Sequence, residues 1–437
     1  MSYTEPLLNL SVSEKVYKLR KHHGISQDEL AEVLEVGPKK ITAIERGEGE
    51  YTEAQLKAIK ILFKIEGLPL TERERDACKW RLYYWRTQVR AGKMDKAKEI
   101  QKEFANIDNL APCDMDIVIL CRLFEVIFLI VNGDSVAAEK KLSQTKKQLN
   151  GISLESLYHY YCCNGYINAH GRYEDALRWY LNAYELKEDN EGLLPEEDKS
   201  LVTNIATCYT YLDLPAVAVF YLQKAQLLYA AEEATTNHVY VDAQLAVNLI
   251  ELNQLSNARR LLAKSMRKAE GLKDNALTGY ILFAYGFMNK KAGGWESAID
   301  YFNSALGYAP KGTDNYYLSI YHKIYCMIQS KKIVEAMHEL ERATSICRTN
   351  DVWAIYFEAL GHYLAINTRM SVSNNESSEY IENIAIPHFI KHFDYFISLD
   401  YYKLLEDHHQ KLKRYKKVAS IKEASKSILE YILANKG

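Results

Sequence analysis

Histidine and cysteine are the residues of this 437-residue chain that could bind a metal or supply a nucleophile. Four of the 12 histidines form adjacent pairs, His22–His23 and His408–His409. Neighbours along a helix point to different faces, so neither pair can share one ligand. His388 and His392 are spaced to lie on one helix face, but no third ligand is apparent near them. We therefore predict no metal site and no cofactor.

The 8 cysteines do not form a redox or zinc pattern either. None is spaced as CxxC, and all lie in stretches that read as helical. We interpret them as reduced, mostly buried thiols of a cytoplasmic protein. A glycine-rich phosphate loop and a serine elbow are also missing from the sequence, so we do not expect an enzyme.

Composition favours a long helical array. A chain of 437 residues exceeds one ordinary core unless that core is a repeat array growing in one dimension. The 8 Pro and 20 Gly are too few for an all-β protein, whereas 33 Tyr suit helices packed in layers. A net charge of −2 argues against a chain covered by nucleic-acid-binding surface. The N-terminus is not a signal peptide, and the longest apolar run, at 124–131, is too short for a bilayer, so no membrane partner is expected.

The first seventy residues predict a small helical bundle with helices at 13–22, 27–34, 38–48 and 52–65. Ser26 and Glu29 have the spacing of a capping box at the start of the second helix. Pro38 occupies the first turn of the third, where its missing N–H costs little. Two short helices joined by a three-residue turn form a helix-turn-helix, whose second helix can enter the major groove of DNA.

The string LRKHHGISQDELAEVLEVGPKKITAIERGE resembles the phage-repressor-like class of these domains. The matching features are SQ at the start of the second helix, ELA within it, the Ile41/Ile44 spacing and the terminal IERG. The resemblance implies that Glu45 and Arg46 hold the domain together. It also implies five DNA contacts: Arg20 and Gln27 at backbone phosphates, and Lys39, Lys40 and Thr42 in the groove.

This bundle departs from the usual pattern in the residues that would read bases. Gly37, Pro38 and Ala43 occupy positions where polar side chains are usual. Glu35 occupies the position in the turn where glycine is usual. Residues 1–70 carry 10 Lys or Arg against 11 Asp or Glu. We therefore expect phosphate contacts and DNA shape to carry most of the specificity. The alternative is that the bundle docks a protein.

A second pattern recurs about every 35–45 residues from about residue 70: Ala, a large apolar residue, then a small residue. GRYEDALRWYLNAY from Gly171 and GGWESAIDYFNSAL from Gly293 are examples. A period of this length predicts an α-solenoid with a long concave surface. We expect helix pairs at 72–107, 114–149, 155–188, 197–230, 237–270, 275–309, 314–348, 351–397 and 398–435.

Small residues early in each second helix should let the two helices of a pair approach closely. They are Ala176, Ala218, Ala258, Ala298 and Ala336, and the clearest turns between helices are Gly92, Gly133, Gly171 and Gly293. The pattern resembles the tetratricopeptide repeat, in about nine copies forming a right-handed solenoid. The polar run at 367–383 predicts a loop.

The whole chain resembles the peptide-sensing regulators of Gram-positive bacteria and their phages, a group that includes PlcR, NprR, PrgX, Rgg and the arbitrium receptors. The fold class implied is all-α: a helix-turn-helix bundle at 1–68 and an α-solenoid of repeats at 69–437. The resemblance implies a homodimeric transcription factor that binds a double-stranded DNA operator. Its repeat domain would dimerise and bind a short signalling peptide.

Side-chain amides are suited to holding an extended peptide, because each carries two donors and an acceptor for backbone groups. A buried backbone group left unpaired costs about 1–3 kcal/mol. The repeat spacing places eleven candidates on the concave face: Tyr161, Asn168, Asn204, Thr207, Tyr211, Tyr240, Gln244, Tyr280, Phe287, Lys291 and Gln329. Asn248 is a twelfth candidate, because its local sequence, LAVNLIELN, is similar to that around Asn204. The same helix faces carry Tyr158, Thr203, Glu251, Phe283, Tyr321, His322 and Tyr325.

Asn204 is the first choice for a backbone clamp, whereas the register places Asn248 near the buried layer. The competing function is sequestration of a protein such as a response regulator, with or without DNA binding. The weak basic character of residues 1–70 leaves that alternative open.

Overall fold

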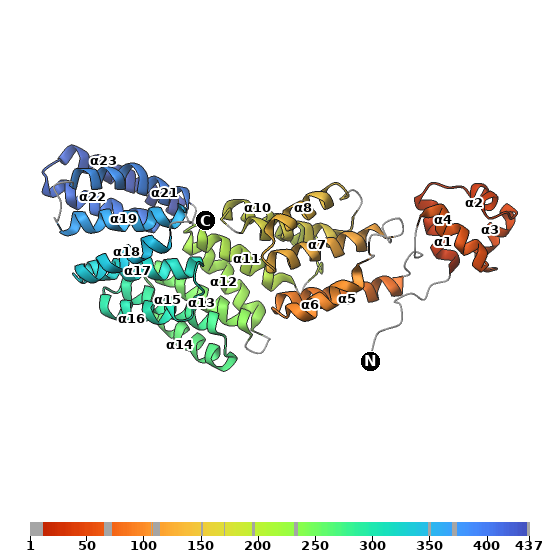
Figure 1. Cartoon of the computed structure of the whole chain (residues 1–437), viewed down its shortest axis with the longest axis horizontal. Helices are drawn as coiled ribbons and strands as arrows, with labels where there is room; N and C mark the ends of the chain where they lie inside the picture. Colours follow the sequence, from red (N-terminus) through yellow and green to blue (C-terminus); the bar gives the residue numbers. More distant parts are fainter. Residues whose placement is uncertain are drawn as a thin grey trace. The chain divides into compact units, whose positions relative to one another are not determined.

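A computed structural model shows an all-α protein (Figure 1), which confirms the predicted fold class. It describes residues 12–64, 72–105, 107, 114–149, 152–169, 171–194, 197–230, 235–347, 351–368 and 374–434, and no strand occurs among them. The chain divides into two compact units, residues 1–170 with 178–194, and residues 171–177 with 195–437. None of the described helices is both long and apolar enough to cross a membrane.

The first unit begins with a bundle of four helices, α1 (Val12–His22), α2 (Gln27–Val33), α3 (Pro38–Glu45) and α4 (Glu53–Phe63). Its core includes Leu19, Leu30 and Ile41, none of which is exposed. The predicted capping box is present: Ser26 Oγ accepts the Glu29 N–H at 3.1 Å, and the Ser26 N–H donates to the Glu29 carboxylate at 2.6 Å. Glu35 takes a φ of +51°, so it does adopt the conformation that a turn glycine favours.

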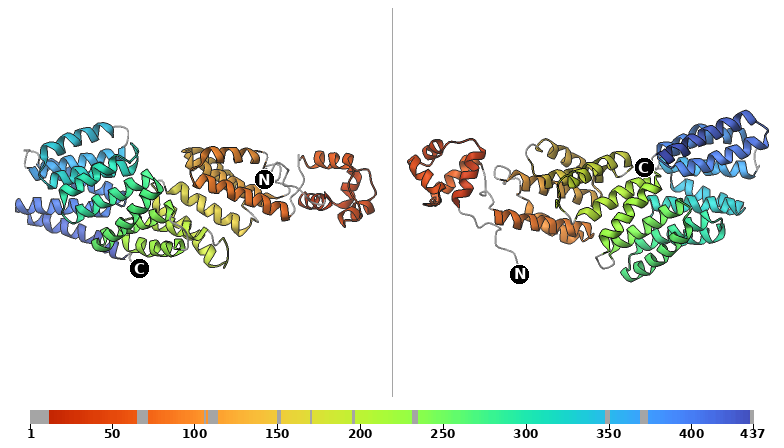
Figure 2. Two further views of the ribbon diagram at one scale, coloured as in Figure 1. Left: turned by 90° about the horizontal axis from the view of Figure 1, so that it is seen from below. Right: turned by 180° about the vertical axis from the view of Figure 1, so that it is seen from behind.

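Helix pairs follow the bundle in both units (Figures 1 and 2). The first unit holds α5 (Glu72–Arg90), α6 (Met94–Gln101), α7 (Met115–Val131), α8 (Ser135–Lys146), α9 (Leu154–Asn168) and most of α10 (Tyr173–Glu188). The second unit holds α11 (Asp198–Tyr211), α12 (Pro215–Tyr229), α13 (Thr236–Glu251), α14 (Leu255–Leu272), α15 (Asn275–Lys291), α16 (Trp295–Leu306), α17 (Asp314–Gln329), α18 (Ile333–Ile346), α19 (Asp351–Thr368), α20 (Asn374–Tyr380), α21 (Ile386–Lys391), α22 (Tyr395–Lys411) and α23 (Tyr415–Ala434).

Close helix approach within a pair depends on small residues, as predicted. The five repeat alanines, Ala176, Ala218, Ala258, Ala298 and Ala336, are all fully buried. Gly286 of α15 lies against the Phe302 ring of α16, and a Cβ on Gly286 would come within 2.7 Å of that ring. The predicted turns at Gly92, Gly133, Gly171 and Gly293 all have positive φ, which glycine adopts at little cost.

The loop predicted at 367–383 is wrong over its second half. Residues 374–380 form α20, which continues as a π-helical turn at 381–385. The polar side chains there find partners on α19 or within the turn: His362 lies 3.1 Å from Ser377 Oγ, and the Tyr380 hydroxyl donates to Glu358 at 2.8 Å. Hydrogen bonding therefore replaces the apolar face that the pattern lacks.

The final helix pair also begins earlier than predicted, at Tyr395 rather than residue 398. Phe393, with a φ of +64°, makes the turn that separates α21 from α22. Seven of the cysteines are buried free thiols, as expected, while Cys113 lies outside the described residues. Burial raises the pKa of the Cys78 thiol to about 11.

Candidate functional site

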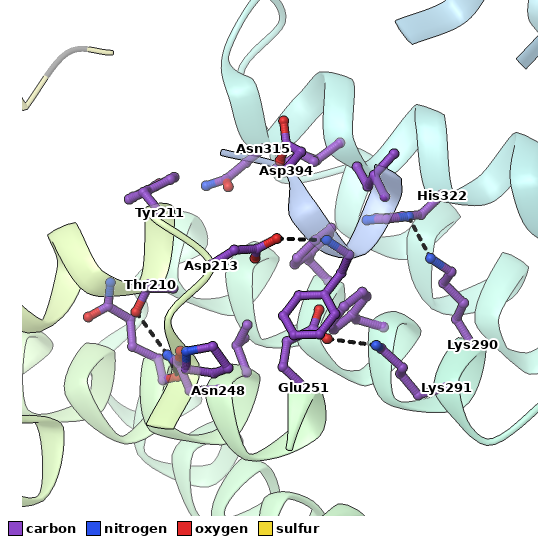
Figure 3. A pocket seen from close by; sticks show the side chains of 18 of the residues that line it. Thr210, Tyr211, Asp213, Asn248, Glu251, Lys290, Lys291, Asn315, His322 and Asp394 are labelled. Atoms are coloured by element: carbon purple, nitrogen blue, oxygen red, sulfur yellow. Dashed lines mark hydrogen bonds and ion pairs between the residues drawn. The ribbon is translucent and has the colours of Figure 1, made fainter. Parts of the chain in front are cut away.

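A cavity of about 150 Å³ lies within the second unit (Figure 3). The first helices of successive pairs, α11, α13, α15 and α17, supply most of its wall, and the turn from α11 into α12 and the start of α22 supply the rest. Its lining residues are Thr210, Tyr211, Asp213, Pro215, Gln244, Val247, Asn248, Glu251, Tyr280, Phe283, Phe287, Lys290, Lys291, Asn315, Leu318, His322, Asp394, Phe396, Ile397 and Asp400.

One wall of the cavity is aromatic. Phe283 and Phe287, one turn apart on α15, have parallel rings with centroids 6.1 Å apart. The His322 ring of α17 packs against Phe287 at 5.4 Å. Burial, and then the neighbouring Lys290 ammonium, lower the pKa of His322 well below its usual value. His322 is therefore a neutral ring at physiological pH, and this wall suits an apolar side chain.

The amide of Asn248 has a fixed orientation. Its Nδ2 donates to Thr210 Oγ1 and to the Gln244 carbonyl oxygen, both at 2.9 Å. Both amide hydrogens are thereby used, which leaves Oδ1 as the free acceptor. Although Asn248 is only 2% exposed, it lines the cavity (Figure 3). Oδ1 can therefore accept one N–H from an extended ligand.

Gln244, one turn earlier on α13, is committed to neighbours instead. Its Nε2 lies 3.1 Å from both Thr207 Oγ1 and the Tyr240 hydroxyl. These bonds hold Gln244 in place beneath Asn248, whose Nδ2 donates to the Gln244 carbonyl oxygen. We infer that Gln244, Thr207 and Tyr240 support the cavity wall.

Carboxylates gather where α22 meets the rest of the cavity. Asp213 Oδ2 accepts the Phe396 N–H at 3.0 Å, and Lys291 Nζ lies 2.6 Å from Glu251 Oε2. Burial, and then the charges of Glu251 and Asp394, raise the pKa of Asp213 well above its usual value. Burial and the charge of Asp314 raise the pKa of Asp394 to about 7. This part of the cavity accordingly favours positive charge.

Six of the twelve predicted peptide-binding residues line this cavity. They are Tyr211, Gln244, Asn248, Tyr280, Phe287 and Lys291. Two more, Thr207 and Tyr240, support it through Gln244. Glu251, Phe283 and His322, which share the same predicted faces, line it as well.

The remaining four candidates lie elsewhere. Asn204 is half-buried on α11 and is not among the lining residues. Gln329 lines a neighbouring cavity and donates to the Tyr363 hydroxyl at 2.8 Å. Tyr161 and Asn168 belong to the first unit, where Asn168 is buried and donates to the Asn164 carbonyl oxygen at 2.8 Å. Their roles in binding stay predictions.

Sequence reasoning missed the lining residues that lie outside the first-helix faces. Asp213 lies in the turn after α11, with a φ of +55°, and Asp394, Phe396 and Asp400 come from the start of α22. No local pattern marks the α22 residues, because about 180 residues separate them from their partner Asp213. Asn315, in the first turn of α17, was also missed.

In the helix-turn-helix, three of the five side chains predicted to contact DNA form hydrogen bonds within the domain. Arg20 is only 3% exposed: its guanidinium donates to both carboxylate oxygens of Glu45, at 2.7 and 2.8 Å, and to the Ile25 carbonyl oxygen at 2.9 Å. These bonds use one N–H on each of the three side-chain nitrogens of Arg20, and its contact with phosphate stays a prediction. Glu45 does hold the domain together, as expected.

Gln27 and Thr42 join the same network, since Gln27 Nε2 donates to Glu45 Oε2 at 2.7 Å and Thr42 Oγ1 donates to Gln27 Oε1 at 3.1 Å. Lys39 and Lys40, in the first turn of α3, are exposed. Of the five predicted contacts, these two lysines are the ones whose charges face solvent. Their contact with DNA stays a prediction.

Known proteins are similar to this chain both in the N-terminal bundle and in the helix pairs that follow it. Residues 16–67 match the family model described as Helix-turn-helix. The structure of a Rap protein complexed with competence and sporulation factor covers 83% of this chain and 100% of its own, at 16% identity and a TM-score of 0.68. The structure of NprR in complex with its cognate peptide NprX covers 80% and 99%, at 21% identity and a TM-score of 0.66.

This chain has a helix-turn-helix domain and the helical fold of Rap and NprR. The apo form of NprR from B. thuringiensis is similar too, at 20% identity and a TM-score of 0.64, with 81% of this chain and 99% of its own covered. No curated protein is similar enough to count as a match. The predicted resemblance to the NprR group is thus confirmed at the level of fold.

Proposed function

We propose that this protein is a transcription regulator that binds operator DNA through its helix-turn-helix and is switched by a short peptide bound in the cavity of its second unit. The observation that carries the proposal is the free acceptor of Asn248 beside an aromatic wall. An extended peptide needs such an acceptor for its backbone and an apolar surface for its side chains. NprR, which has a similar fold, has been solved with a cognate peptide.

Peptide binding is tested by selection from a displayed library of short random peptides against the full chain. Selected peptides are synthesised, labelled and titrated by fluorescence anisotropy. We expect saturable binding that competes among the selected sequences, because one cavity accepts them. If no peptide is selected, or if substitutions of the lining residues leave peptide affinity unchanged, the cavity of the second unit does not bind the peptide.

DNA binding is proposed to depend on Lys39 and Lys40, the exposed cations at the start of α3. Lys39→Ala/Lys40→Ala should weaken a gel shift with the gene's own upstream DNA. It should also lower the salt dependence of binding, by about one unit of slope for each phosphate that a lysine neutralises. Lys57→Ala/Lys60→Ala on α4 is the matched control, since it removes the same charge from another exposed helix face. Equal weakening in both variants would contradict a specific role for α3.

Sequestration of a response regulator is the second candidate function. It is favoured by the internal bonding of Arg20 and Gln27, which leaves few side chains to contact DNA. The fold is also similar to that of a Rap protein. Absence of any sequence-dependent gel shift at low salt, together with capture of a purified response regulator, would favour this function over the first.

A further inference from the structure

One hydrogen bond joins two parts of the second unit that lie far apart in the sequence. Asp213, in the turn between α11 and α12, accepts the N–H of Phe396 in the first turn of α22 (Figure 3). The first N–H groups of a helix have no partner within the helix, so they need an acceptor from outside. Asp394, at the N-cap of α22, does not supply one with its side chain. Asp213 therefore caps α22 from another repeat.

The carboxyl group of Asp394 is engaged elsewhere. It accepts the hydroxyl of Tyr356 on α19, which holds it beside Asp213 without capping the helix. Two further links join α22 to the opposite wall: Lys290 Nζ lies 3.8 Å from Asp400 Oδ2, and Lys291 Nζ lies 5.1 Å from the centre of the Phe396 ring. These polar contacts join the start of α22 to the cavity wall, while Tyr395 packs against Ile428 and Ile432 of α23.

Negative charge opposes this arrangement. The carboxylates of Glu251 and Asp394 both lie near Asp213, and the Lys291 ammonium, paired with Glu251, partly offsets their charge. The charged or titratable groups around the contact, from the elements packed there, are Glu174 of α10, Glu251 of α13, Lys290 and Lys291 of α15, Asp314 of α17, Tyr356 of α19, and Asp394, Tyr395 and Asp400 at α22. Carboxylates outnumber the cations in this set, so separation of α22 from Asp213 relieves like-charge repulsion.

We propose that the Asp213–Phe396 contact is a latch that closes the cavity, and that positive charge, supplied by a proton or by a basic side chain of the bound peptide, selects the latched form. A protonated carboxyl keeps an oxygen that can accept the Phe396 N–H, so neutralisation removes the repulsion without removing the bond. A basic side chain would act in the same way from within the cavity. The peptide part of this inference rests on the proposed function, and the proton part does not.

The direction of the pH dependence follows from the latched form. Burial and the neighbouring carboxylates raise the pKa values of Asp213 and Asp394 when α22 is in place. The latched form therefore binds more protons than the open form. Latching is fully favoured below the carboxyl pKa values of the open form, and it is lost as the pH rises through about 7. Each proton taken up changes the latched-to-open ratio by up to about tenfold per pH unit.

Hydrogen exchange of the unliganded full-length protein tests the latch directly, because the Phe396 N–H is itself the donor. We expect the protection factor of the segment containing Phe396, corrected for the intrinsic exchange rate, to rise by up to about tenfold per pH unit as the pH falls from about 8.5 to about 6. Asp213→Asn keeps an acceptor without the charge, so its protection at about pH 8.5 should exceed that of the wild type and should depend less on pH, since Asp394 alone still titrates. Asp213→Ala removes the acceptor, so its protection should be low at every pH.

Asp407→Asn is the matched control, since Asp407 lies further along α22 in an exposed pair with Lys403. It should show the wild-type pH profile. Wild-type protection that does not vary with pH, or the same low protection in Asp213→Asn as in Asp213→Ala, would overturn the latch.

The peptide arm repeats the library selection at about pH 8, where the carboxylates of the open form are ionised. Wild-type protein should enrich peptides containing Lys or Arg, and Asp213→Asn/Asp394→Asn should lose that enrichment. Selection of peptides without basic residues would overturn the peptide part while the exchange result decides the proton part. Selection of no peptide at all would refute the proposed function instead.

Discussion

Asn248→Ala is the substitution that examines the proposed binding cavity most directly. In the wild type, Thr210 and Gln244 take both hydrogens of the Asn248 amide, so Oδ1 is oriented before a ligand arrives. Removal of the amide leaves one ligand N–H without an acceptor inside the cavity. That unpaired group costs about 1–3 kcal/mol, which raises the Kd about 5-fold to 150-fold.

The same substitution should do limited damage to the fold. Thr210 Oγ1 keeps its bond to the Ala206 carbonyl oxygen at 3.0 Å, so it is not left unsatisfied. The Gln244 carbonyl oxygen still accepts the helical N–H four residues on. We expect a decrease of about 1–2 kcal/mol in the free energy of unfolding, from the two side-chain bonds and the small void. Thermal unfolding by circular dichroism measures this separately from binding.

Fluorescence anisotropy with a library-selected peptide gives the Kd, and Asn204→Ala is the matched control. It makes the same change on α11, at the residue that the sequence favours as the clamp. A Kd within about twofold of wild type for Asn248→Ala, with a large increase for Asn204→Ala, would refute the reasoning from amide orientation. Ligand recognition would then depend on Asn204, which is not among the residues that line the cavity.

Two further substitutions and one chemical reaction test how the helices are packed. Arg20→Ala leaves the Glu45 carboxylate buried without its cation, so it should destabilise the α1–α4 bundle by about 3–5 kcal/mol, measured as faster hydrogen exchange in residues 12–64. Gly286→Ala places a Cβ within 2.7 Å of the Phe302 ring and should lower the free energy of unfolding by about 1–3 kcal/mol in a denaturant titration. Burial raises the pKa of the Cys163 thiol, so alkylation mapped by mass spectrometry should label it at about pH 8 only after unfolding.

Local features of this fold could be predicted from the sequence because their causes are local. The Ser26–Glu29 capping box involves residues three apart, and the repeat alanines follow the helical period. The polar run at 374–383 was misjudged because its stability comes from partners on α19, such as Glu358 for the Tyr380 hydroxyl. Composition alone cannot show that a polar residue will find a partner.

The candidate site could be predicted only in part, for the same reason. Repeat spacing identified the faces of α13 and α15, and hence Gln244 and Phe287, whereas it placed Asn248 near the buried layer. It could not show that Arg20 would pair with Glu45, 25 residues away, and be buried. It also could not bring α22 to Asp213, because that contact depends on the summed rotation of all the intervening repeats.

The contact between Asp213 and α22 distinguishes two kinds of cavity residue. Some contribute to peptide affinity in both forms of the protein, and others contribute to the shift from one form to the other. A ligand shifts an equilibrium between two forms only by the difference in its affinity for them. Asn248 is held by Thr210 and Gln244, neither of which belongs to α22, so its bond to a ligand persists whether or not α22 is latched. Phe396 and Asp400 line the cavity only when α22 is in place.

A shift from 1:99 to 99:1 requires about 5.5 kcal/mol of differential binding. In this protein that difference has to come from the start of α22 and from the charge around Asp213, because these groups change their surroundings when the latch forms. A variant at Asn248 should therefore need more peptide to give the same response, whereas a variant at Phe396 should bind peptide and respond less. Affinity and response would then be set by different helices of one cavity.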